Sequence, residues 1–515
     1  MENQTTAAVA AGDGKAEKAA LNAEARQRRA RERAEKRSSP LARQKKRELP
    51  WILYDVGNSA FTLLVSAILP IYFNALVTGA GLSGTDATAI WGYAASGVTL
   101  CVAVISPILG SFTDYKGLKK PFFFFSAVIG VIGCAALGIP MSWVAFLALF
   151  VITKIAYSVS LVFYDAMLPD VADLKRVDIV SSKGYAWGYI GSCIPFILSI
   201  VLVLTVDTAI SMPIAFIINA VWWLAFTLPL TKSYKQTHFV EREPHPVRQN
   251  FKRLASVFTK NGGVKNRKGI ILFLVAFFLY IDGVYTVIDM ATSFGTALGL
   301  ETSGLLIALL VTQIVAFPSA IAFGKLAGKV SNELLITISI CAYTFVGAFA
   351  IFMHSMWQFW VLAVMVGLFQ GGIQALSRSY FTKIIPAEHS GTLFGIMDIF
   401  GKGAAFIGTL LVSVVTQATD SVNLGAIPIV CLFVAGLAMF IVAAKYNKPF
   451  IAQSQQAENE AERQQAEQAA AQGDGAFGDV QYEGTSDGVH GEGTSDGAEQ
   501  AVSADIAEGT DGENI

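Results

Sequence analysis

The chain is poor in charge and in cysteine. Of its 515 residues only 15% are Asp, Glu, Lys or Arg, whereas 53% are hydrophobic, a balance far from that of a soluble globular domain. The five cysteines have no paired C-x-x-C spacing, which argues against a disulfide framework or a metal site. Neither a GxxxxGK[ST] phosphate loop nor an HExxH pair is present. We therefore expect no enzyme, no ATP-driven pump, no cofactor and no nucleic-acid partner.

The chain instead contains many long apolar segments. A bilayer core about 30 Å thick requires roughly 20 apolar residues per helix, and between residues 50 and 446 about twelve segments meet this length. They start near Trp51, Ala87, Pro121, Met141, Lys183, Ala209, Gly269, Thr302, Glu333, Met356, His389 and Val422. The sequence therefore predicts an all-α membrane protein with twelve transmembrane helices, embedded in a lipid bilayer.

Lys and Arg are missing from every second connection between these segments. Residues 81–88 and 299–303 have none, whereas residues 116–120, 175–183, 232–268 and 325–329 are basic. The positive-inside rule assigns the basic connections to the cytoplasm. An even number of spans then places both termini on the cytoplasmic side.

The two tails differ in charge. Residues 1–50 contain thirteen Lys and Arg against seven acids, and residues 451–515 contain one Arg against fifteen acids. We interpret residues 1–49 as a basic cytoplasmic tail, solvated or in contact with anionic lipid headgroups. Residues 447–515 repeat GTSDG at 484–488 and 493–497 in a Gly, Ser and acid-rich background. This composition predicts a disordered cytoplasmic tail.

The spans divide into two similar halves. The longest basic connection, residues 233–268, separates residues 50–232 from residues 269–446. Pro107 is followed ten residues on by Gly117, and Pro318 is followed ten residues on by Gly328. The repeat predicts two six-helix halves related by an axis along the membrane normal, an arrangement known from major facilitator transporters.

The connection between the second and third spans carries the most specific motif, GSFTDYKGLKK at residues 110–120. It resembles the signature loop of the major facilitator superfamily. Gly110 permits close helix approach, Gly117 permits a positive φ, and Asp114 can accept hydrogen bonds from the start of a neighbouring helix. Leu118 stands where the family usually has a basic residue, so Lys119 is the expected cation of this gating loop.

Further stretches narrow the resemblance. They are WILYDVGNS (51–59), LYIDG (279–283), GGIQALSRS (371–379), FG (394–395) and GK (401–402). Together they look like the vacuole-effluxer-like branch of the superfamily, over residues 51–445. This resemblance implies export of small solutes by secondary active transport, with amino acids as the best-known cargo.

Ionisable residues inside the spans are the candidate binding groups, because such residues are costly in lipid and normally face a cavity or a partner. Depth counting at ~1.5 Å per residue places Lys154, Asp282 and Lys402 near the midplane. On the seventh span, Asp282 is followed at helical spacing by Tyr285 and Asp289. The predicted substrate or coupling-ion residues are Asp55, Asn58, Lys154, Tyr157, Asp282, Tyr285, Asp289, Gln374, Arg378 and Lys402.

We expect Asp282 to exchange a proton or to pair with a substrate ammonium group, while Lys154, Lys402 or Arg378 binds a carboxylate. Two structural alternatives are a salt bridge between Lys154 and Asp282 that only holds the bundle together, and pairing of Lys402 with Asp398 four residues earlier.

Two other functions fit the same sequence: a proton-coupled importer of sugars or other nutrients, and a non-transporting receptor or scaffold. A bacterial source would imply the plasma membrane, and a fungal source would imply the vacuolar membrane. The sequence leaves the oligomeric state and the role of the tails open.

Overall fold

The computed structural model describes residue 28 and residues 40–241 and 266–474, and nearly all of these residues form helices. The predicted tails and central connection lie partly outside the described residues, so the division into halves at residues 233–268 stays a prediction. The GTSDG repeat lies wholly outside them. Residues 1–458 form one compact unit and residues 459–515 are assigned to a second.

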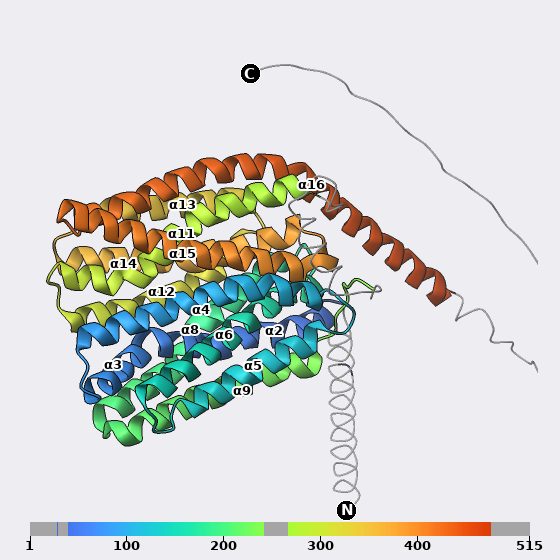
Figure 1. The fold of residues 1–515 in the computed structure, drawn as a ribbon. Helices are drawn as coiled ribbons and strands as arrows, with labels where there is room; N and C mark the ends of the chain where they lie inside the picture. Colours follow the sequence, from blue (N-terminus) through green and yellow to red (C-terminus); the bar gives the residue numbers. More distant parts are fainter. Residues whose placement is uncertain (1–27, 29–39, 242–265, 475–515) are drawn as a thin grey trace, which may run out of the picture. The chain divides into compact units, whose positions relative to one another are not determined.

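The helices fall into two groups along the chain. The first contains α2 (Pro40–Leu63), η1 (Leu64–Ile68), α3 (Leu69–Gly79), α4 (Gly84–Thr113), α5 (Lys119–Ala136), α6 (Trp143–Ala166), α7 (Leu168–Val171), α8 (Val177–Thr205) and α9 (Thr208–Ser233). The second contains α11 (Arg267–Ala297), α12 (Thr302–Leu326), α13 (Asn332–Ala350), α14 (Met356–Ile384), η2 (Ala387–His389), α15 (Ser390–Thr419), η3 (Leu424–Ala426) and α16 (Ile427–Asp474). Figure 1 shows them as a bundle.

Twelve helical segments of the described residues are long and apolar enough to span a membrane, which confirms the predicted fold class. Several begin at a polar residue that caps the first turn. Ser83 and Asp86 form a capping box at α4, and the Ser331 side chain accepts the amide of Leu334 at α13. These caps mark where the chain leaves the apolar layer and its first amides need acceptors.

The first span is interrupted by the π-helical turn η1, which separates α2 from α3. Pro70 explains the interruption, because it has no amide hydrogen to donate to the carbonyl four residues earlier. Val65, within this turn, lines the cavity described below.

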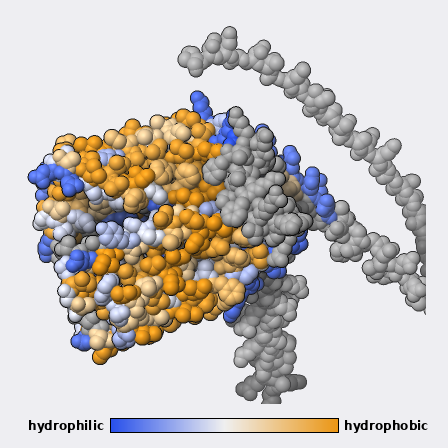
Figure 2. Space-filling view, viewed as in Figure 1, coloured by the Kyte–Doolittle hydropathy of each residue, from blue (hydrophilic) through white to orange (hydrophobic). Residues whose placement is uncertain are grey.

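Each group of helices packs around its own apolar cluster. One is built from buried residues between Trp51 and Tyr234, and the other mainly from residues between Ile270 and Ala443. The groups meet where α4 packs against α15 and α8 packs against α12. Outward-facing side chains such as Leu100, Ile132, Phe345 and Val434 remain exposed, and apolar residues cover the helices in Figure 2. A bilayer is the solvent in which such a surface is stable.

Helix α16 differs from the sequence prediction. Residues 447–474, which we expected to be disordered, continue this helix. Residues 453–472 contain only Ser, Gln, Ala, Glu, Asn and Arg, and Ala, Gln, Glu and Arg favour helix. The low hydrophobicity of this segment therefore excludes burial in a core, but it does not exclude a helix.

Candidate functional site: a polar cavity between the two groups of helices

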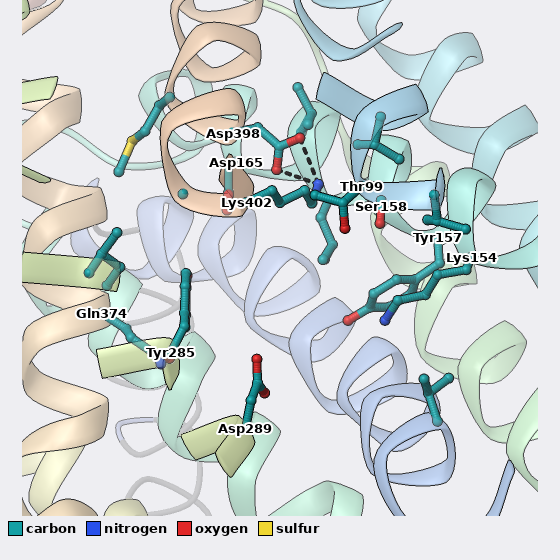
Figure 3. Close-up of a pocket in the computed structure, with 18 of the residues that line it drawn as sticks. Thr99, Lys154, Tyr157, Ser158, Asp165, Tyr285, Asp289, Gln374, Asp398 and Lys402 are labelled. Atoms are coloured by element: carbon teal, nitrogen blue, oxygen red, sulfur yellow. Dashed lines mark hydrogen bonds and ion pairs between the residues drawn. The ribbon is translucent and has the colours of Figure 1, made fainter. Parts of the chain in front are cut away.

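A cavity of about 460 Å³ lies between the two groups of helices, a volume suited to a small molecule. Its polar lining comes from both groups. The lining residues that carry polar side chains are Thr99, Lys154, Tyr157, Ser158, Asp165, Tyr185, Tyr285, Asp289, Gln374, Arg378, Asp398 and Lys402, and most are labelled in Figure 3. In Figure 2 a hollow with polar residues opens at the end of the bundle where α3 is joined to α4.

Lys154 and Asp289 are the two cavity charges without an ion pair among the described residues. Lys154 on α6 lies 4.8 Å from the centroid of the Tyr157 ring and 5.9 Å from that of Phe61, so aromatic faces stabilise its ammonium group. Asp289 on α11 is exposed to the cavity. Figure 3 shows both side chains bordering the same space from different helices.

Asp398 and Lys402 on α15 pair with each other. The Lys402 ammonium lies 2.5 Å and 2.6 Å from the two carboxylate oxygens, and the Ser106 hydroxyl of α4 donates to the same carboxylate at 2.8 Å. This i, i+4 pair is the structural alternative weighed from the sequence. Lys402 therefore carries a compensated charge in this conformation.

Arg378 closes the base of the cavity by reaching from α14 into the first group of helices. Its guanidinium donates to Asp165 at 2.9 Å, to Asp55 at 3.4 Å and to the Ser181 hydroxyl at 2.9 Å. It also lies over the rings of Trp51, Tyr164 and Tyr185, at 4.6, 5.4 and 4.3 Å from their centroids. A planar fork with five donors suits such a many-partner site better than an ammonium group does.

The remaining predicted residues surround this base. The Asn58 amide donates to Asp55 at 3.2 Å, and the hydroxyls of Tyr157 and Thr62 lie 2.5 Å apart. Gln374 accepts from Tyr189 at 3.0 Å. Sequence analysis missed Tyr164, Ser181 and Tyr185 as partners of Arg378, because no charge or regular spacing distinguished them from packing residues.

Asp282 does not line the cavity. The cavity-lining residues of α11 follow the i, i+4 line through Phe277, Ile281, Tyr285 and Asp289, and Asp282 lies about 100° round the helix from Ile281. Its side chain is fully buried against α15 and no hydrogen-bond partner of Oδ2 is found within the described part of the chain. Among the described residues Asp282 forms no salt bridge with Lys154, the structural alternative weighed from the sequence.

Residues 110–120, the predicted gating loop, join α4 to α5 at the other end of α4, which we call the latch end. Asp114 is fully buried and accepts the amides of Gly391 at 2.7 Å and Thr392 at 3.1 Å, at the start of α15. Gly110 and Gly391 pack so closely that a Cβ on either would clash with the carbonyl group of the other. Gly117 adopts φ +78° in the turn. These contacts fasten the second group of helices to the first.

Lys119 also joins the two groups of helices at the latch end. Its buried ammonium group donates to Asp170 at 3.0 Å, to the Ala166 carbonyl at 3.1 Å and to the Ser390 hydroxyl at 2.9 Å. Asp170 also accepts hydrogen bonds from Tyr234 and from the amides of Thr237 and His238. Sequence analysis missed Asp170, although an acid between two spans and near a basic loop is a readable signal.

The latch carboxyls have opposite pKa shifts. Burial raises the pKa of Asp114, and the hydrogen bond from Thr392 and the Lys119 ammonium oppose this shift. Burial alone would also raise the pKa of Asp170, but the Lys119 charge and hydrogen bonds from His238 and Tyr234 outweigh it and hold the pKa below its ordinary value. Asp170 is therefore the ionised partner that compensates Lys119.

In the part of the chain that the structure describes, twelve helical segments of membrane-spanning length form a bundle with a cavity between its two groups of helices. This is the architecture of major facilitator transporters. Solved structures support this class through the fold. The human organic anion transporter MFSD10 has a TM-score of 0.61 at 13% identity, over 78% of this chain and 100% of its own. The proton:xylose symporter XylE has a TM-score of 0.57 at 12% identity, over 79% and 95%.

The chain belongs to the family described as vacuole effluxer Atg22 like, whose model matches residues 43–448. An MFS-type transporter of Bacillus subtilis, YxiO, is 40% identical over 420 residues, which cover 80% of this chain and 97% of YxiO. Autophagy-related protein 22 of Yarrowia lipolytica is 26% identical over 297 residues, or 51% of this chain and 50% of that protein. The protein is thus a multi-pass membrane transporter, and the resemblance predicted from sequence is confirmed.

Proposed function

We propose that this transporter carries small zwitterionic solutes, such as amino acids, by alternating access. The observation that supports the proposal best is the pair of cavity charges without ion-pair partners in the described structure, Lys154 and Asp289. A solute carboxylate would bind Lys154, and a solute ammonium group would bind Asp289. A zwitterion compensates both charges at once, whereas a sugar would leave both charges without an ion-pair partner when the cavity closes and excludes water.

The two charges also suggest how binding is linked to movement. Lys154 belongs to the first group of helices and Asp289 to the second, so a bound zwitterion contacts both groups. A ligand shifts a conformational equilibrium only through its different affinity for the two states. A solute held between α6 and α11 gains from any movement that shortens both contacts, and it thereby favours closure of the cavity around itself.

The opposite movement must open the latch end. It has to separate Arg378 from Asp55 and Asp165, and Asp114 from the start of α15. Leaving one buried charge without its partner costs about 3 to 5 kcal/mol, so closure at the open end must replace these contacts. If the positive-inside rule holds, the latch end is cytoplasmic and the cavity described here faces the outside. Export would then load the solute in the opposite conformation.

The test is counterflow of labelled amino acids in liposomes that contain the full-length protein. We expect saturable flux in the wild type and its loss in both Lys154→Ala and Asp289→Asn, since each removes one end of the zwitterion site. Asp420→Asn, at a connection, and Lys329→Ala, outside the cavity, are matched controls that should retain flux. Flux of amino acids that persists in both cavity variants would contradict the proposed site.

The same liposomes distinguish the cargo classes. Labelled sugars and labelled amines or carboxylates that lack the second charge serve as comparison solutes. A zwitterion preference that Asp289→Asn converts into acceptance of simple carboxylates would support the charge assignment. Equal flux of sugars and amino acids in the wild type would contradict it.

A further inference from the structure

Asp282 is a buried acid at a helix contact that the zwitterion site does not use. Its side chain has no exposed surface, and its Oδ1 accepts the amide of Gly408 on α15 at 2.9 Å and the hydroxyl of Thr286 at 3.4 Å. Its Oδ2 is buried without a hydrogen-bond partner in the described structure. A Cβ on Gly408 would overlap the Asp282 and Thr286 side chains. Glycine at this position therefore lets the carboxyl group reach the backbone of α15.

No cation among the described residues forms an ion pair with Asp282. On α15, Asp398 and Lys402 pair with each other, and on α14, Arg378 and Lys383 pair with other acids. Helices α12 and α13 also pack against α11, and α16 approaches α11 where Phe433 lies against Gly283. The charges of these three helices among the described residues lie in the end turns or beyond the apolar part of each helix: Lys325, Glu333, Lys445, Lys448 and the later residues of α16. On α11 itself, Arg267 and Lys268 lie in the first turn and Asp289 lies at the cavity.

An ionised carboxylate in this position would be a buried charge without a countercharge, which is costly inside a membrane protein. A bound proton removes that cost. Within the described part of the chain, no group of three or more His, Cys, Asp or Glu side chains that could hold a metal ion surrounds Asp282. The proton is therefore the ligand that this site fits.

We propose that Asp282 is a proton-binding site separate from the solute cavity, and that its protonation changes the hold of α11 on α15. This inference rests on the proposed function, because it supplies the coupling ion for that transport. The amide of Gly408 lies inside α15, where it would ordinarily donate to the carbonyl of Ala404. An ionised Asp282 competes strongly for this amide, whereas a protonated Asp282 accepts it more weakly.

Helix α15 links this site to the rest of the transporter. Its first turn binds Asp114 at the latch, and its middle carries Lys402 at the cavity. A proton that weakens the contact at Gly408 would free α15 to move at both places. The proton would enter from water in the cavity when α15 separates from α11, and it would leave to water on the other side after the switch.

Infrared spectroscopy of the full-length protein in lipid bilayers tests the proton site directly, without a solute. We expect a protonated-carboxyl C=O band that titrates with pH in the wild type, is lost in Asp282→Asn and is retained in Asp289→Asn, the matched variant on the same helix. A wild type with no titrating band, or a band unchanged in Asp282→Asn, would overturn the proposal. If Asp282→Asn fails to fold, Thr286→Val removes one donor and should shift the band; an unshifted band would also overturn it.

Hydrogen–deuterium exchange of the α15 segment around Gly408 tests the coupling. After correction for intrinsic exchange, protection in the wild type should change with pH, and Asp282→Asn should abolish that change. A pH dependence of equal size in Asp282→Asn would overturn the coupling. Neither readout uses a solute. A failed amino-acid assay would therefore refute the proposed cargo, and the infrared and exchange experiments would still test the proton site separately.

Discussion

The absence of a Cβ atom at two glycines lets the two groups of helices pack closely at the latch end. Gly110 on α4 and Gly391 at the start of α15 face each other, and each lacks the Cβ that would strike the other backbone. Asp114 then reaches the first amides of α15, which have no acceptor within that helix. The positive end of the α15 dipole lies at the same place. One missing carbon on each side therefore makes room for this contact.

Gly110→Ala should weaken the latch. Overpacking costs about 1 to 3 kcal/mol, which corresponds to a roughly 5 to 150-fold shift toward the open latch. Ser390→Cys, buried at the latch, reports opening through its rate of maleimide labelling in a background without the native cysteines. Gly97→Ala is the control on the same helix, since a Cβ there meets nothing within 4 Å. Equal labelling in both alanine variants would contradict this role of Gly110.

Asp170 should make the stability of the latch end depend on acid. Its pKa is held below the ordinary value in the folded protein. Its stabilisation is therefore complete above the unfolded pKa of about 3.9 and is lost as pH falls through the folded pKa. Asp170→Asn leaves Lys119 buried without its counterion and should cost roughly 3 to 5 kcal/mol at neutral pH.

Thermal unfolding of the purified protein across a pH series measures both effects. The Tm of the wild type should fall below about pH 4. Asp170→Asn should have a lower Tm than the wild type at neutral pH, and its Tm should fall less in acid. The exposed Asp420→Asn serves as the comparison. An acid transition of the same size in Asp170→Asn and the wild type would show that other groups control it.

At the scale of elements, three contacts between the helix groups have different chemistry. Helices α8 and α12 pack side by side, α4 and α15 meet through the latch, and α14 reaches α2, α6 and α8 through Arg378. The Arg378 contact lies directly at the cavity base. Arg378 therefore connects the cavity lining directly to α2, α6 and α8.

Arg378→Lys should open the cavity base although it keeps the charge. An ammonium group cannot bond Asp55, Asp165 and Ser181 together or stack on the surrounding rings as a guanidinium does. Spin labels on Lys232→Cys and Glu388→Cys, both exposed near the latch end in different groups, should move apart in pulsed EPR. Lys329→Arg, outside the cavity, is the control, and an unchanged distance distribution in Arg378→Lys would argue against this role.

For the whole molecule, the compact unit ends at residue 458, within α16. The cavity and latch residues all precede this point. A transporter that works through these sites does not require residues 459–515 for flux, whereas a receptor or scaffold that signals through its tail does.

Removal of residues 459–515 should therefore leave amino-acid counterflow in liposomes within about twofold of the wild type. Truncation at residue 458 keeps Glu458, whose side chain accepts the amide of Leu174 at 2.9 Å. A second truncation at residue 452 removes this contact and measures its contribution. Loss of flux in the first truncation, from protein that is still folded, would favour a functional tail.

The sequence alone determined the membrane fold, because a bilayer requires about 20 apolar residues per helix and every hydrogen bond of the helix is made within its own segment. It also indicated Lys154, Asp289 and Arg378 as candidate binding residues, since charges inside spans are rare. The motif at residues 110–120 indicated the gating loop. Helix α16 departed from prediction because disorder was judged from low hydrophobicity.

Only the tertiary structure decided which charges have partners. Lys402 pairs within its own helix, Arg378 binds two acids of the other group, and Lys154 and Asp289 are left facing the cavity. In the sequence, Asp282 lies at helical spacing from Tyr285 and Asp289. In the structure, the side of α11 that carries Asp282 faces α15, whereas the side that carries Tyr285 and Asp289 faces the cavity. Helical spacing fixes how side chains lie relative to one another. Which side faces the cavity depends on the neighbouring helices, and their packing arises from contacts far apart in the chain.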